Sequence, residues 1–142
     1  MNTNLFGMRA YNKNMVTHTT QGVKISVEAY YQNDYSTPIN WEFMFAYRIT
    51  IENNSPYTVK LLKRHWNIFD SIGEFKEVEG VGVVGKQPTL KPGEQHQYVS
   101  GCSLKSEMGK MSGDYLMQRL EDGKMFKVII PEFKLIAPLK MN

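Results

Sequence analysis

The chain has 142 residues, the usual size of a single domain, and 42% of them are hydrophobic, which is enough for a packed core. The net charge is only +3 and basic and acidic residues interleave, which argues against a nucleic-acid surface. The single Cys102 excludes an internal disulfide, and with three histidines it leaves few ligands for zinc, so we expect no metal and no cofactor. No segment has the length of a membrane-spanning helix or the apolar core of a signal peptide, which predicts a cytoplasmic protein without membrane insertion.

Period-two alternation of apolar and polar residues begins at residues 23–29, where the odd positions are apolar. This pattern predicts a half-buried strand. Residues 1–20 show no alternation and predict a flexible N-terminal arm, and residues 138–142 predict a C-terminal tail. The expected domain therefore spans residues 21–137, and Met15 is an alternative start that would make residues 1–14 an upstream extension.

The strongest alternation lies in residues 41–52, which we expect to form the central core strand. Six large side chains share one face of this segment: Trp41, Phe43, Phe45, Tyr47, Ile49 and Ile51. Residues 53–56, Asn-Asn-Ser-Pro, then supply turn residues, so the chain is expected to reverse there.

The apolar residues change phase within the next predicted strand, residues 57–69. Leu61 falls on an odd position, whereas Trp66 and Ile68 fall on even ones. One extra residue in a strand moves the following side chains to the opposite face. The change of phase therefore predicts a bulge near residues 61–63.

The second half of the chain predicts shorter strands between turn signals. The expected strands are residues 75–79, 96–102, 110–119, 125–130 and 133–136. Asp122-Gly123 is the strongest hairpin signal, and Pro131 requires an edge strand or a bulge because proline has no N–H to donate. No helical period is sustained, so we predict an all-β fold: an immunoglobulin-like or fibronectin type III-like antiparallel β-sandwich of about seven to eight strands.

A glycine pattern at residues 80–85, Gly-Val-Gly-Val-Val-Gly, has the spacing of a dinucleotide-binding loop. That loop must open a helix, and the prolines at positions 88 and 92 exclude one, so the pattern favours a loop between strands. An alternative is a phosphate-type anion held by exposed amides beside a lysine. The ligand-binding candidates here are Gly80, Gly82, Gly85 and Lys86.

Arg64, His65 and Trp66 are consecutive residues of a predicted strand, so the first and third share one face and His65 points to the other. Arg64 and His65 are further ligand-binding candidates, and Trp66 is expected in the core. No nucleophile is placed beside a base, so we assign no catalytic residue and predict a protein that is not an enzyme. Cys102 is expected to be a small buried hydrophobe.

Four acidic residues near two predicted loops offer oxygen ligands for a weakly held hard cation, although surface acids do so in many domains. They are Glu107, Asp114, Glu121 and Asp122. We assign no metal site to them.

Several ordered motifs together carry a family resemblance. They are Phe45–Asn53, Leu61–Trp66, Gly80–Gly85 with Gln87-Pro88, Pro92–Glu94, Tyr98–Cys102 and Gly109–Tyr115. Over about residues 20–136 the chain resembles the ApaG family, also called CorD. The resemblance implies a fibronectin type III-like sandwich in a bacterial cytoplasmic protein linked to cobalt and magnesium efflux, without established enzymatic activity. Related eukaryotic domains imply a module that binds other proteins.

The chain departs from the family at Val81, where members commonly carry a glutamate, so a role for that carboxylate does not transfer. Family members usually begin near the position of Met15.

Our leading hypothesis is a non-catalytic interaction module that affects divalent-cation homeostasis through a protein partner. The alternative is a binder of pyrophosphate, polyphosphate or a dinucleotide at the loop Gly80–Lys86. An edge strand of the sandwich also allows a homodimer.

Overall fold

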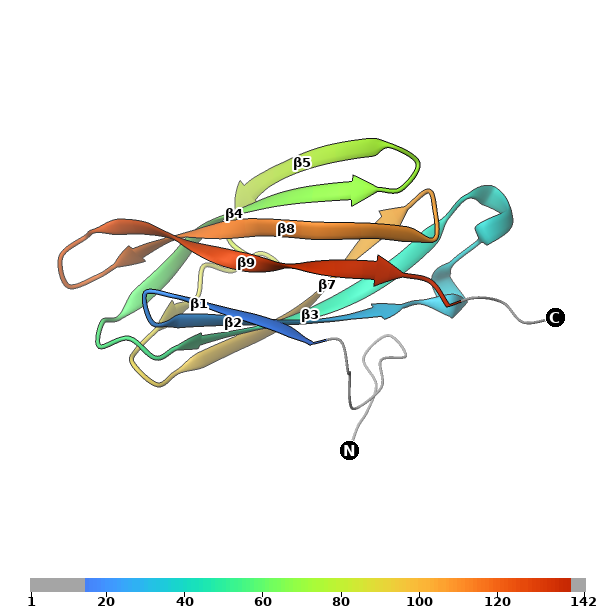
Figure 1. Cartoon of the computed structure of the whole chain (residues 1–142). Coiled ribbons are helices and arrows are strands. Elements are labelled where there is room, and N and C mark those ends of the chain that lie inside the picture. Colours follow the sequence, from blue (N-terminus) through green and yellow to red (C-terminus); the bar gives the residue numbers. More distant parts are fainter. Residues whose placement is uncertain (1–14, 139–142) are drawn as a thin grey trace, which may run out of the picture.

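A computed structural model describes residues 15–138, which form a two-layer β-sandwich (Figure 1). Two short 3-10 helices, η1 (Asn33–Tyr35) and η2 (Pro38–Asn40), connect the second and third strands. The strands are β1 (Val16–Thr20), β2 (Val23–Tyr31), β3 (Phe43–Asn53), β4 (Val59–Asp70), β5 (Glu74–Val81), β6 (Thr89–Leu90), β7 (Gln95–Leu104), β8 (Met108–Arg119) and β9 (Met125–Ile136). No helix in this part of the chain is long and apolar enough to cross a membrane.

The first sheet has the strand order β1-β2-β3-β7, and the second has the order β5-β4-β8-β9, with β6 paired to β4. All of these pairings are antiparallel. The arrangement confirms the predicted antiparallel β-sandwich. The strands number nine in the described residues because β1 and the two-residue β6 add to those expected.

Both predicted irregularities of the second sheet are present. The register of β4 against β8 shifts between Leu61 and Lys63, where the change of phase predicts a bulge. Pro131 lies in β9, the edge strand of the sheet, within a second register shift opposite Met111 and Gly113. The chain crosses this irregular stretch as one strand, so the separate strand expected at residues 133–136 is the end of β9.

Two sequence-based expectations are corrected. Val16–Thr20 form β1 and pair with β2, so the expected arm is wrong over its last residues; residues 1–14 lie outside the described part of the chain. This edge strand has mostly exposed side chains and therefore no alternation to detect.

Trp41 was expected on the buried face of the core strand, and this expectation is wrong. It is 67% exposed and follows η2 with a positive φ, so the core strand begins at Phe43 instead.

The core lies between the two sheets, where the side chains of β3 meet those of β4 and β9. Tyr47 from β3 packs against Trp66 and Phe133, with ring centroids 5.4 Å and 5.6 Å away. The buried hydroxyl groups of Tyr98 in β7 and Tyr115 in β8 form a hydrogen bond between the two sheets, with an oxygen–oxygen distance of 2.5 Å. Apart from Trp41, which precedes β3, the side chains predicted for the buried face of this strand are buried: Phe43, Phe45, Tyr47, Ile49 and Ile51.

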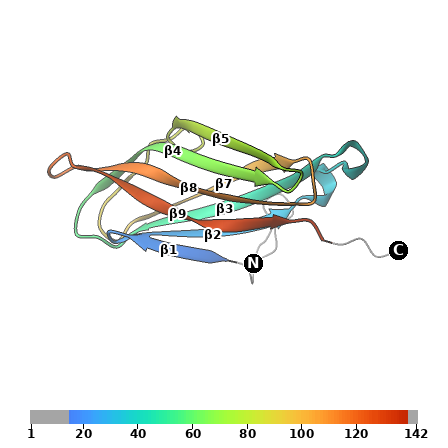
Figure 2. The same cartoon turned by 45° about the horizontal axis from the view of Figure 1, so that its top comes forward.

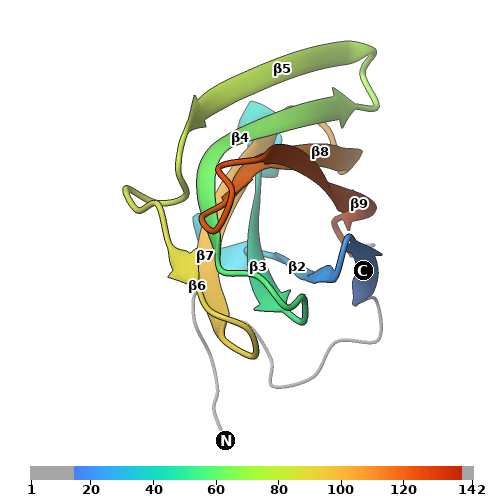
Figure 3. The same cartoon turned by 90° about the vertical axis from the view of Figure 1, so that its left-hand side faces the viewer.

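The two lateral sides of the sandwich differ. On the side that we call the closed side, β9 lies beside β1 and β2 (Figure 2), and the Ile129 amide donates to Thr20 Oγ1 at 3.1 Å. On the opposite, open side, β5 stands apart from the strands of the first sheet (Figure 3). Most of its residues are exposed, and among the strands of residues 15–138 it pairs only with β4. A groove lined by residues of both strands lies between β5 and β7.

Candidate functional site

The β5–β7 groove is the strongest candidate site on the open side. Its volume is about 430 Å³, and strands of both sheets line it. Its walls and floor include Arg64, Trp66, Lys76, Val78, Ser100 and Cys102. It combines an apolar floor with polar and charged groups, as binding clefts commonly do.

Strand alternation explains which side chains face the groove. Successive residues of a strand point to opposite faces of the sheet. In the pairing of β4 with β5, Arg64 lies opposite Gly80 and Trp66 lies opposite Val78. Ile68 pairs with Lys76 two positions farther along. The side chains of these residues line the groove, except at Gly80, which has none.

Arg64 holds the end of β5 in place. Its guanidinium donates through Nη1 to the carbonyl oxygens of Val81 and Gly82, at 3.1 Å and 3.0 Å. It lies so closely on Gly80 that a Cβ there would come within 2.6 Å of the guanidinium carbon. Gly80 therefore serves as the flat surface on which Arg64 rests.

Residues 82–86 form a tight turn whose amides bind protein carbonyls. Val83 and Lys86 exchange backbone hydrogen bonds of 2.8 Å and 3.0 Å, and the Gly82 amide donates to the Leu62 carbonyl at 2.8 Å. The positive φ angles of Val84 and Gly85 between them are those of a type I′ turn. Three amides of the expected anion-binding nest are thus already engaged, and a phosphate-type ligand at this loop stays a prediction.

Gly82 and Gly85 need to be glycine for different reasons. Its φ is +65°, and a Cβ at this position would lie 2.2 Å from the Lys86 carbonyl oxygen. Gly85 also has a positive φ, +74°, but open space surrounds it. Gly82 is fixed by both conformation and a close backbone contact, whereas Gly85 is fixed by conformation alone.

His65 lies on the outer face of the second sheet, away from the groove that Arg64 lines. Its Nε2 lies 2.7 Å from Glu77 Oε2 on β5, and its Nδ1 lies 3.4 Å from Asp114 Oδ2 on β8. The hydrogen bond to Glu77, and less so the one to Asp114, raises the pKa of His65. Of the six candidate residues, Arg64 and the three glycines belong to one region with Lys86, and His65 does not.

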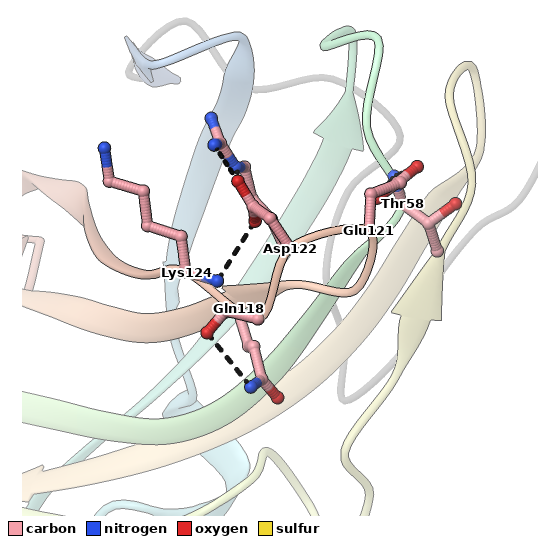
Figure 4. Close-up of polar contacts among 7 residues, drawn as sticks. Thr58, Gln118, Glu121, Asp122 and Lys124 are labelled. Atoms are coloured by element: carbon pink, nitrogen blue, oxygen red, sulfur yellow. Dashed lines mark hydrogen bonds and ion pairs between the residues drawn. The ribbon is translucent and has the colours of Figure 1, made fainter.

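The four acidic residues considered as oxygen ligands do not gather at one place, and Asp114, Glu121 and Asp122 already have protein partners. Glu107 precedes β8 and Glu121 follows it, so they lie at opposite ends of a long strand. In the hairpin between β8 and β9, Glu121 accepts the Thr58 amide at 2.9 Å, and Asp122 accepts the Lys124 amide at 3.1 Å (Figure 4). Residues 15–138 contain no group of three His, Cys, Asp or Glu side chains that fits a metal ion.

Cys102 confirms its expected structural role. It is 8% exposed, and burial raises the pKa of its thiol to about 11, so it is protonated at neutral pH. No histidine is among the residues that line the groove. Among the residues that line the groove, Cys102 therefore has no imidazole beside it to activate its thiol.

Sequence reasoning missed Lys76 and Val78 as site residues. The signal was present, because Lys76, Val78 and Gly80 alternate with Glu77 and Glu79 along β5. Alternation shows that they share a face, but both faces of β5 are largely exposed, and only the pairing with β4 shows which one meets the groove.

Known proteins match both the sequence and the fold. Residues 33–119 match the ApaG domain. Protein ApaG of Brucella anthropi is 48% identical, and Protein ApaG of Paramagnetospirillum magneticum is 44% identical; each alignment of 124 residues covers 87% of this chain and 95% of the relative. A crystal structure from Bordetella pertussis, described as ApaA, is 36% identical with a TM-score of 0.79 and covers 92% of this chain and 100% of that one. The chain belongs to the ApaG family.

Proposed function

We propose that the chain is a non-catalytic interaction module of the cytoplasm that binds a partner protein at the β5–β7 groove. The observation that carries this proposal is the exposure of β5, which projects from the sandwich and has one strand neighbour, β4. An unpaired strand edge has backbone donors and acceptors with which an extended segment of another protein can pair. β7 is also an edge strand, so the groove lies between two free edges.

Exposed side chains on β5 support the same proposal. Val78 is 38% exposed toward the groove, and Phe75 and Val81, on the outer face of the same strand, are more than half exposed. Apolar side chains left open to solvent on a projecting strand are a feature of protein-binding surfaces. Glu77 and Glu79 lie between them and limit nonspecific sheet pairing.

We further propose that an effect on cobalt and magnesium passes through the partner. The link to these cations comes from the family resemblance. The acidic groups of the hairpin are occupied by Thr58, Arg119 and Lys124, and Asp70 accepts hydrogen bonds from Lys105 and Ser106. An indirect role is consistent with carboxylates that already have protein donors.

Site-specific photocrosslinking tests the proposed function. A photoreactive amino acid replaces Val78 in the groove, and a matched control variant carries it at Ile129, a half-exposed residue of β9 on the far side. We expect the full-length chain to capture the same protein repeatedly from position 78 and not from position 129. Capture from neither position, or equal capture from both, would contradict a partner site at this groove.

A further inference from the structure

We propose that the β5–β7 groove accepts an extended acidic segment with the pattern acid-x-apolar-x-acid. The inference rests on the proposed function and specifies the partner chemistry that this site recognises. Arg64 and Lys76 are the two positive positions, and Trp66 with Val78 forms the apolar position between them. The occupant is a segment of a partner protein in β conformation.

The spacing of the two cations matches the repeat of a strand. Arg64 is opposite Gly80, and Lys76 precedes Gly80 by four residues on β5. In an extended chain, every second side chain points to the same face and each residue advances about 3.3 Å. Two acidic side chains four residues apart on a segment that runs along β5 would therefore reach one cation each.

The charge of these two positions is not cancelled within the groove. Lys76 forms no ion pair within 4.0 Å in the described part of the chain, and the acceptors bound by Arg64 are neutral carbonyls. Of the acidic groups of the groove, Glu74 lies 3.3 Å from the Lys105 ammonium, and Asp70 accepts neutral donors, among them the Lys105 amide at 2.6 Å. The three basic residues of the lining, Arg64, Lys76 and Lys105, still outnumber these two acidic ones. Carboxylates on the bound segment would complement the remaining charge.

The position between the cations requires an apolar side chain. Trp66 and Val78 are cross-strand partners and lie between the Arg64–Gly80 and Ile68–Lys76 pairs. Trp66 is buried, whereas Val78 is partly exposed to the groove. An apolar residue midway between the two acids would cover Val78 and add buried area at the centre of the contact.

Peptide titrations followed by amide NMR shifts test the pattern on the full chain. The probe is a seven-residue capped peptide with Glu-Thr-Leu-Thr-Glu at its centre, and controls replace both glutamates with lysines or move them three residues apart. We expect saturable shifts at β5 and β7 with the probe, and a dissociation constant at least about tenfold weaker for either control.

Charge reversal assigns the contact to Lys76. Lys76→Glu changes an exposed residue, so folding is preserved, and Lys134→Glu is the matched control on the exposed face of β9. We expect roughly tenfold weaker binding for the first variant only, with rescue by a peptide in which the facing glutamate is lysine. Equal effects of the two variants, or no shifts at millimolar peptide, would overturn the inference.

Two further outcomes separate this inference from the proposed function. If crosslinking at Val78 captures a partner and the acidic peptide does not bind, the partner site stands and the acidic pattern is wrong. If sedimentation shows a dimer that Lys76→Glu dissociates, the occupant is a second copy, and the inference is again overturned.

Discussion

The two lateral sides of this sandwich bury their edge strands to different extents. On the closed side, β9 alternates regularly between buried and exposed residues and meets β1 and β2. On the open side, β5 is exposed along most of its length and faces β7 across a groove. The comparison shows that β9 contributes to the core, whereas β5 contributes little apolar burial and, within the described residues, keeps one strand edge unpaired.

The largest expected effect tests whether stability resides on the closed side. Leu135 of β9 is fully buried, so Leu135→Ala should lower the free energy of unfolding by about 3 kcal/mol through lost burial and a cavity. Val78→Ala on β5 should cost less than about 1 kcal/mol, because Val78 is partly exposed. Urea unfolding curves measure both, and equal losses would remove the distinction between the two sides.

The next largest difference in stability is expected between alanine variants of two glycines in the turn that follows β5. Gly82→Ala should destabilise the chain by about 2–3 kcal/mol, since the residue has a positive φ and its Cβ would collide with the Lys86 carbonyl. Gly85→Ala has the unfavourable φ without the collision and should cost about 1 kcal/mol. Similar unfolding midpoints for the two variants would show that the turn relaxes around Gly82.

A smaller, pH-dependent effect concerns the attachment of β5 to its sheet by His65. The pKa of His65 is raised above 6.5, chiefly by Glu77, so protonated His65 stabilises the folded chain below pH 6.5 and this contribution disappears as pH rises through the raised pKa. The unfolding free energy lost in His65→Gln should therefore be greater at pH 5.5 than at pH 8.5. NMR titration should give a lower pKa for His65 in Glu77→Gln, and an unchanged value would exclude Glu77 as the main cause.

The smallest effect is expected from a phosphate ligand at the turn. The amides of Gly82, Val83 and Lys86 donate to protein carbonyls, so millimolar pyrophosphate should leave their NMR signals in place. A saturable shift confined to residues 80–86 would contradict this expectation and favour the small-ligand alternative.

Much of the fold is predictable from the sequence because its signals are local. The alternation of β3 and the turn residues that follow it act over a few positions, and the change of phase at Leu61 predicts the observed register shift. β1 escapes prediction because an exposed edge strand has no buried face. Trp41 is misplaced because alternation does not reveal where a 3-10 turn ends and the strand begins.

The site is less predictable because it depends on pairing between distant strands. Arg64 and the glycines are recognisable as unusual residues, but their contact follows from the register of β4 and β5. Lys76 resembles any surface lysine until the register aligns it with Ile68. The groove itself arises because β7 and β5 end their sheets without meeting, a property of topology that no local pattern records.

Because Cys102 is buried in the wall of the groove, the rate at which its thiol is alkylated should show whether a ligand occupies the groove. It is the single cysteine of the sequence, and with a thiol pKa of about 11 it should react slowly with alkylating reagents near neutral pH. A segment bound in the groove would cover the access route and slow alkylation further, whereas a ligand at the distant β8–β9 hairpin would not. The alkylation rate, followed by intact mass, would thus report groove occupancy in the unmodified protein without an added label.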